Sequence, residues 1–308
     1  MTPDPQTGNP MKGILLVTLA VMAFALADVA TKHLTMLYTV TLVIALRYLV
    51  NLFLLGALLG PRHGRGLLTT RRTGLVFLRA LCLAAASLTM GIALSYMPVG
   101  ETVAIIYLAP FLVVLLSGPL LGEKVPLAGW IGAAAGFAGV LLIVRPGSGL
   151  DPLGVGFALV NAGFSAGYHL LSRVLARTES TIAMLFHSAL IGTVIFGAML
   201  FWTGLGPLPT GWDIPILLAL GALATLGHFL LTAAYREAPA SLLAPVNYMH
   251  LVWAALLGAL VFGHFPDGLT IFGMVIVAVA GVAVALRAHL ARQSATRPAL
   301  ATIDPEAH

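Results

Sequence analysis

Long apolar runs, separated by short polar breaks, make up most of the chain. Each run holds about 20 residues, the length that an α-helix needs to cross the hydrocarbon core of a bilayer. In that setting every backbone amide must find its partner inside the same helix. Cutting the sequence at its charged and Pro/Gly-rich clusters predicts ten helices, at 12–32, 38–60, 73–96, 99–121, 126–144, 153–173, 181–203, 212–235, 240–263 and 268–288. The fold class that we expect is therefore an all-α integral membrane protein with ten transmembrane helices.

The pattern occurs twice, with one constant offset. Pro98 and Pro239 are 141 residues apart, and so are Tyr107 and Tyr248. The same offset relates Gly122 to Gly263, Gly132 to Gly273 and Lys32 to Arg173. A constant offset indicates an internal repeat, so we divide the chain into a first repeat at 12–146 and a second at 151–288. Each repeat holds five helices, an odd number, so the second should have inverted topology, which places a binding site at the repeat interface near the midplane.

Composition and charge agree with a membrane protein. The chain is 59% hydrophobic and 9% charged, whereas soluble domains carry roughly a quarter charged residues. With the N-terminus inside, the inner loops and tails hold twelve Lys and Arg residues against two on the outer side. Because cytoplasmic loops carry such an excess, we expect the tails 1–11 and 289–308 to be cytoplasmic. Residues 1–10 and 293–308 are polar and contain proline, so we expect them to be disordered. This topology explains the net charge of +5, and we expect no nucleic-acid partner.

Residues that would carry metal or enzyme chemistry are few. Cys82 is the one cysteine, so an internal disulfide or a thiolate metal site is impossible. The intramembrane histidines are not spaced as ligands on one helix, and the chain has no phosphate-binding loop. Gly163-Phe-Ser-Ala-Gly167 matches a serine-nucleophile motif, but that motif needs a strand-to-helix turn. We expect no metal, no cofactor and no enzymatic activity, and keep an intramembrane enzyme as a remote alternative.

Polar side chains inside the apolar runs are the candidate substrate-binding residues, since an ionisable residue at a helix centre costs about 2.5–3.5 kcal/mol. Asp28 and Lys32 are four residues apart and face the same side. Asp28 therefore either contacts a ligand or a proton, or forms an ion pair with Lys32. The offset of 141 relates Phe24 and Asp28 to Ser165 and His169, which predicts two equivalent stripes facing one cavity.

Further candidates lie on the helix at 212–235 and its equivalent. His228 and Tyr235 belong to its polar face, and Ser87 takes the position equivalent to His228 in the first repeat. Two charged residues receive structural interpretations instead. Arg47 is expected to pack against carbonyl groups or a helix C-terminus, and Glu101 to favour the positive N-terminus of its helix.

The ninth predicted helix is rich in amide and aromatic groups. Asn247, Tyr248 and Trp253 follow Pro245, which frees a backbone carbonyl about one turn earlier. Tyr107 is the equivalent of Tyr248 in the first repeat. We expect all these candidates to line a cavity between helices 12–32, 73–96, 99–121, 153–173, 212–235 and 240–263. Interhelical hydrogen bonds and aromatic packing remain the alternative roles.

Several sequence blocks, Ala93-Leu-Ser-Tyr-Met-Pro98, Tyr107-Leu-Ala-Pro110 and Gly122-Glu-Lys124, together with Lys32 and Arg47, resemble one known family. Over residues 12–288 the chain looks like the drug/metabolite transporter superfamily, in its ten-helix EamA-type exporter branch. Within that branch it is similar to the aromatic amino acid (YddG-like) exporters of the bacterial inner membrane. There are departures: His264 stands where the family usually has Glu after Gly263, and many members carry a neutral residue in place of Asp28.

The pattern and the resemblance together predict a secondary active exporter that works by alternating access in the bacterial inner membrane. The resemblance implies small metabolites as cargo, above all amino acids with aromatic or other neutral side chains. The expected partners are the small-molecule substrate and the lipid bilayer, with the chain a monomer or a weak homodimer. The alternative is a proton-coupled exporter of cationic drugs, with Asp28 or Glu101 as the proton-coupled carboxylate.

Overall fold

The computed structural model describes residues 9–121, 127–145, 147–175, 178–238, 243 and 246–300. Within these ranges the side chains of 65, 117, 121, 128, 235, 236, 285 and 288–300 are not described. All regular secondary structure in the described ranges is helical. The elements are α1 (Pro10–Leu37), α2 (Val40–His63), η1 (Gly64–Leu67), α3 (Thr73–Tyr96), α4 (Val99–Ile106), α5 (Ala109–Leu121), α6 (Leu127–Ile143), α7 (Pro152–Leu175), α8 (Thr181–Thr203), α9 (Asp213–Glu237), α11 (Met249–Phe262) and α12 (Gly268–Leu300).

Six described segments are long and apolar enough to cross a membrane. They are Pro10–Leu37, Val40–His63, Thr73–Tyr96, Val99–Leu116, Thr181–Thr203 and Asp213–Ala234. Three shorter apolar segments lie at Gly129–Ile143, Met249–Phe262 and Gly268–Val284. The chain is thus a multi-pass, all-helical membrane protein in its described parts, while ten crossings remain a prediction.

The predicted helix at 99–121 is wrong as one continuous helix, because it breaks at Tyr107 and Leu108 between α4 and α5. Pro110 lacks the N–H that would bond to the carbonyl of Ile106, and its ring crowds that carbonyl. The chain resumes with hydrogen bonds from Phe111 and Leu112 to the carbonyl of Leu108. The predicted helix at 240–263 likewise contains a turn at Tyr248, directly before α11. The two breaks therefore fall at equivalent positions of the two repeats.

The C-terminal end of the chain differs from the predicted structure. Asn9 caps α1, since its side chain accepts hydrogen bonds from the backbone N–H groups of Met11 and Lys12. α12 continues to Leu300, so the tail at 293–308, which was expected to be disordered, is helical as far as it is described. Residues 1–8, 301–308 and the Gly122-Glu-Lys124 block lie outside the described residues.

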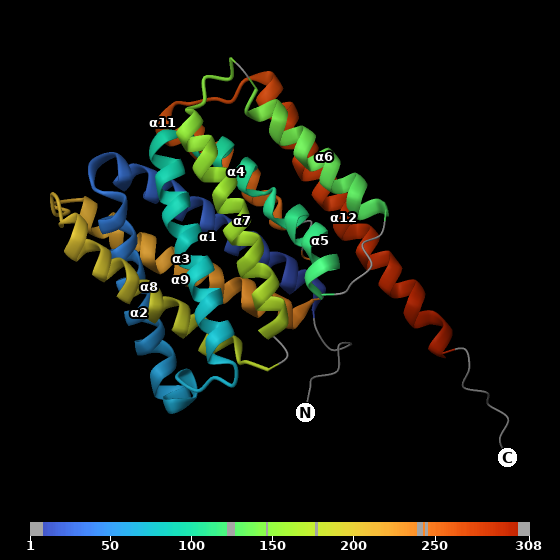
Figure 1. The fold of residues 1–308 in the computed structure, drawn as a ribbon, viewed down its shortest axis with the longest axis horizontal. Helices are drawn as coiled ribbons and strands as arrows, with labels where there is room; N and C mark the ends of the chain where they lie inside the picture. Colours follow the sequence, from blue (N-terminus) through green and yellow to red (C-terminus); the bar gives the residue numbers. More distant parts are fainter. Residues whose placement is uncertain are drawn as a thin grey trace.

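Helices of the two halves pack against each other in an equivalent pattern (Figure 1). The most extensive contacts join α1 to α9 and α3 to α7, and the offset of 141 converts the first pair into the second. α2 packs on its own equivalent α8, and α6 on its own equivalent α12. At the α6–α12 contact a Cβ on Gly139 would lie 2.8 Å from the carbonyl oxygen of Gly273. The halves are thus interlocked, and the space between them is where a site should be sought.

Candidate functional site

The two repeat-equivalent tyrosines lie side by side at the helix breaks. The rings of Tyr107 and Tyr248 are 5.0 Å apart, and the Tyr107 hydroxyl donates a hydrogen bond to the Asn247 carbonyl at 2.6 Å. A Cβ on Gly281 of α12 would lie 1.8 Å from the Tyr248 ring, so glycine leaves the room that this ring occupies. The interface between the repeats therefore passes through a pair of tyrosines that the sequence offset predicts.

Asp28 of α1 binds His250 of α11, a partner that spacing along one helix does not indicate. Asp28 Oδ2 lies 3.0 Å from His250 Nε2, with the side chains 16% and 15% exposed. The expected ion pair between Asp28 and Lys32 is wrong, because Lys32 bonds to backbone carbonyls instead. The two halves of the molecule are thus joined by a polar contact near the tyrosines.

Aromatic rings surround this pair. Phe24 lies 5.0 Å from His228 and 6.3 Å from His250, and Tyr107 lies 5.9 Å from His250. Together with Tyr248, these residues form what we call the aromatic cluster. Four segments that are distant in sequence contribute to it: α1, the break between α4 and α5, α9, and the start of α11. It brings together Phe24, Asp28, Tyr107, His228 and Tyr248 of the predicted site.

A cavity of about 370 Å³ adjoins the aromatic cluster at His228. It runs between α2, α3, α8 and α9 and reaches Arg62 and His63 at the exposed end of α2. Ser87 and His228 line it, as predicted, and α3 and α9 are two of the expected lining helices. α2 and α8 were missed, although Arg47 and Asn51 stand four residues apart on one face of an apolar helix, a signal that the sequence contained.

Arg47 forms part of the wall of this cavity. Its Nη2 donates to the Ser87 hydroxyl at 2.7 Å, and its guanidinium carbon lies 5.0 Å from the centre of the Tyr48 ring. The Tyr48 hydroxyl lies 2.8 Å from the same Ser87 oxygen. Arg47 was expected to pack against carbonyls or a helix C-terminus. Its partners in the structure are instead two side chains, Ser87 and Tyr48, which hold the guanidinium beside the cavity.

A second cavity of about 290 Å³ lies against the tyrosines. The predicted residues Tyr107, His169, Asn247 and Tyr248 contribute to its lining. Asp28, the repeat equivalent of His169, is not among the described lining residues of either cavity and binds His250. That the two equivalent stripes face one common cavity therefore stays a prediction.

Ser165 and Trp253 are not among the described lining residues of either cavity. Ser165 donates to the Asn161 side chain at 3.0 Å, and the Asn161 amide donates to the Ala86 carbonyl of α3. This is an interhelical hydrogen bond, and the motif around Ser165 lies inside α7 rather than at a strand-to-helix turn. Trp253 packs with the apolar residues between α1 and α9, and its buried Nε1 finds no described hydrogen-bond partner. The side chain of Tyr235 lies outside the described residues.

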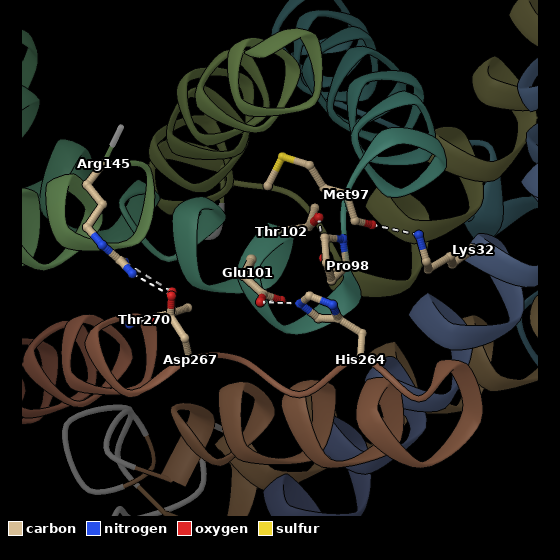
Figure 2. Close-up of polar contacts among 9 residues, drawn as sticks. All are labelled: Lys32, Met97, Pro98, Glu101, Thr102, Arg145, His264, Asp267 and Thr270. Atoms are coloured by element: carbon tan, nitrogen blue, oxygen red, sulfur yellow. Dashed lines mark hydrogen bonds and ion pairs between the residues drawn. The ribbon is translucent and has the colours of Figure 1, made fainter. Parts of the chain in front are cut away.

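The opposite end of the bundle is closed by polar contacts (Figure 2). Lys32 donates to the carbonyls of Leu94 and Met97 at 2.9 and 2.7 Å. Glu101, in the first turn of α4 and only 3% exposed, lies with Oε1 2.9 Å from His264 Nε2. We call this set the closed end. Glu101 stands at a helix N-terminus as expected, but its carboxylate also links α4 to the segment before α12.

A second link at the closed end joins α6 to the start of α12. Arg145 binds the Asp267 carboxylate, and Asp267 Oδ1 accepts the backbone N–H of Thr270 at 2.8 Å. The hydrogen bond from the Thr270 N–H group is the main reason why the pKa of Asp267 lies below its usual value, and Arg145 lowers this pKa further. The acid is therefore charged at neutral pH and keeps this link formed.

Comparison with known proteins identifies a family that shares this two-repeat architecture. Residues 11–145 and 152–287 each match the EamA-like transporter family. The chain belongs to that family. This confirms the family that the sequence blocks predicted, and the two matches coincide closely with the two halves related by the offset. Over 89% of this chain and 96% of the other, the fold also superimposes on a solved crystal structure with a TM-score of 0.64 at 22% identity.

Named relatives of the chain transport chemically different molecules. It is 26% identical over 272 residues to the pseudopaline exporter CntI of Pseudomonas aeruginosa, covering 88% of this chain and 95% of that one. It is 29% identical over 218 residues to an S-adenosylmethionine uptake transporter of Rickettsia bellii, covering 70% and 73%. It is 31% identical over 255 residues to a riboflavin transporter of Brucella anthropi, covering 80% and 89%. The chain is thus related to metabolite transporters, and the narrower likeness to aromatic amino acid exporters stays a prediction.

Proposed function

We propose that this protein is a secondary transporter that exports a small metabolite across the bacterial inner membrane by alternating access. The observation that carries the proposal is the cavity of about 370 Å³ between α2, α3, α8 and α9, which joins helices of both halves. Its size is that of a site for one small molecule. Such a site at a repeat interface, reachable from one end while the other is closed, fits the alternating-access scheme.

The proposed topology has ten crossings in two inverted repeats, 12–146 and 151–288, with both chain ends in the cytoplasm. It rests on the excess of Lys and Arg in the loops of one side. With this orientation the cavity faces the cytoplasm, because α1 begins and α2 ends at the same end of the bundle as the cavity mouth. The closed end then faces the periplasm, so the described conformation is the one that loads an exported molecule.

For the cargo we propose amino acids with aromatic or other neutral side chains. His228 lines the cavity and packs on Phe24, and the tyrosine pair belongs to the same aromatic cluster. Neutral hydrogen-bonding groups of Asn51 and Thr225 lie along its wall. Together these groups suit a small zwitterion with an apolar body.

Counterflow in proteoliposomes tests this assignment. Vesicles containing the full-length protein are loaded with one unlabelled amino acid and given labelled phenylalanine or threonine outside. We expect accelerated uptake of the label with the aromatic set inside. Absence of exchange for every amino acid, with and without a pH gradient, would remove the amino acid assignment and leave the fold and family untouched.

Export of cationic drugs is the alternative, and the two carboxylates that it would use are already paired. Asp28 binds His250 and Glu101 binds His264. Asp28→Asn keeps an acceptor for His250 but removes the charge. We expect this variant to retain amino acid counterflow, measured as above. Loss of efflux of a cationic dye such as ethidium in the variant, with dye efflux by the unchanged protein, would favour the drug exporter.

A further inference from the structure

The cavity of about 370 Å³ has arginine charges in its wall and no described acidic partner for them. Arg47 and Arg62 line it, and among the described lining residues there is no Asp or Glu. Arg62 stands at the exposed mouth, where water screens it. Arg47 stands deeper, in the first half of α2, and is half-buried. The inner part of the cavity is therefore positive where solvent screening is weak.

Arg47 is held in one orientation without a counter-ion. Ser87 accepts its Nη2–H group, and the Tyr48 ring supports one side of the guanidinium. In the described part of the chain no carboxylate forms an ion pair with it. A guanidinium carries five N–H donors, so this arrangement fixes the group and leaves donors for a molecule in the cavity.

Arg79 adds a second charge behind the wall. It is 4% exposed and donates to the hydroxyls of Ser172, Ser188 and Tyr168 and to the Met184 carbonyl. All four partners are neutral. Ser188 also lines the cavity, so Arg79 is separated from it by a single side chain. Hydrogen bonds satisfy Arg79, but nothing among these partners neutralises it.

Unpaired charge in a low-dielectric interior is costly, and an entering anion would offset that cost. The planar fork of a guanidinium matches the two oxygens of a carboxylate. We propose that Arg47 binds a carboxylate of the transported molecule, with Ser87 and Tyr48 as positioning residues. The proposal rests on the transport function above and names the chemical group by which this cavity recognises its cargo.

The rest of the cavity defines the body of that molecule. Leu55, Leu59 and Phe229 supply apolar surface, and the His228 ring packs on Phe24 at the inner end. His228 and Phe229 of α9 both line the cavity, so its wall carries two aromatic rings besides the aliphatic side chains. A small carboxylate with an apolar or aromatic body fits this lining, and an amino acid is one member of that class.

Binding to the purified full-length protein in detergent tests the proposal. The probes are N-acetylphenylalanine and its neutral amide, which differ at the carboxylate and share the aromatic body. We expect the acid to raise the melting temperature in a saturable manner, and the amide to have little effect. Arg47→Gln should weaken binding of the acid by at least about tenfold, which corresponds to 1.4 kcal/mol. Equal binding of acid and amide, or no binding of the acid, would overturn the proposal.

Further variants separate this role from a purely structural one. Arg47→Lys keeps the charge and loses the fork, so it should bind the acid with intermediate affinity, and it serves if Arg47→Gln does not fold. Ser87→Ala should weaken acid binding less than Arg47→Gln. Arg71→Gln, at an exposed position away from the cavity, is the matched control and should bind like the unchanged protein. Full acid affinity in both Arg47 variants would contradict the assignment.

The counterflow assay distinguishes failure of this site from failure of the proposed cargo. Arg47-dependent binding of the acid without amino acid counterflow would keep the carboxylate site and remove amino acids as cargo. Amino acid counterflow that is unchanged in Arg47→Gln would remove the carboxylate site and keep the cargo.

Discussion

The ammonium nitrogen of Lys32 lies 2.7 Å from the carbonyl oxygen of Met97 and 2.9 Å from that of Leu94. In a continuing helix the Leu94 carbonyl would accept the N–H of residue 98, but Pro98 has none. Lys32 of α1 therefore supplies the donor that the end of α3 lacks. A cation at a helix C-terminus also interacts favourably with the helix dipole.

Replacing Lys32 tests this contact. Lys32→Met leaves the carbonyls of two buried residues, Leu94 and Met97, without this donor, and should lower the free energy of unfolding by roughly 1–3 kcal/mol. The melting temperature in detergent measures the effect. Lys32→Arg keeps charge and donors and should lose less. Equal losses in the two variants would show that side-chain shape, and not the carbonyl contact, decides stability here.

The pair of Glu101 and His264 gives a prediction with an internal control. His264→Ala removes the described partner of a carboxylate that is 3% exposed, and should cost about 1–3 kcal/mol. Adding Glu101→Gln removes the charge left behind, so the double variant should melt higher than His264→Ala alone. If the double variant melts lower, the buried carboxylate is satisfied without His264 and this account of the pair is wrong.

Gly281 should not tolerate a methyl group. Its Cβ would lie 1.8 Å from the Tyr248 ring and would displace that ring, which packs against Tyr107. Gly281→Ala should cost about 1–3 kcal/mol through overpacking and slow counterflow as well. Gly197→Ala is the control, since a Cβ there meets nothing within 4 Å. If both variants transport at the same rate, the packing of the tyrosine pair does not affect transport.

Asp267 should make the stability of the closed end depend on pH. Its pKa is lowered from the usual 3.8, first by the Thr270 N–H and then also by Arg145. The stabilisation is thus fully present above about pH 4 and is lost as the pH falls through the lowered pKa. The difference in melting temperature between the unchanged protein and Asp267→Asn should shrink as the pH is lowered from 7 to 3. A difference that stays constant would contradict the linkage.

Much of the fold follows from local sequence signals. Apolar length predicts the spanning helices, and the offset of 141 brings Tyr107 and Tyr248 to equivalent places. The helix breaks at these tyrosines were missed because apolar runs do not reveal them, although Pro110 marks the first one. The extension of α12 to Leu300 was missed because the polar composition of that segment was taken as a sign of disorder.

The site was harder to predict because its partners are distant in sequence. Spacing on one helix suggested Lys32 as the partner of Asp28, whereas the fold supplies His250, 222 residues away. Lys32 is drawn elsewhere by the carbonyls that Pro98 leaves without donors. Arg47 received a structural role for the same reason, since nothing in its own helix shows that Ser87 and a cavity lie opposite.

The sequence of the second repeat contains the residues for a counterpart of the Lys32 contact. The offset of 141 converts Lys32 into Arg173, and Leu94 and Met97 into Tyr235 and Ala238, with Pro239 in the place of Pro98. The same missing donor thus occurs at the end of α9, near the mouth of the cavity. Each repeat thus ends the equivalent helix with a carbonyl that a proline leaves without its donor, and each has a basic residue at the equivalent position of its first helix. In the proposed topology these two helix ends lie on opposite sides of the membrane, so the repeat gives both sides of the transporter the same local chemistry.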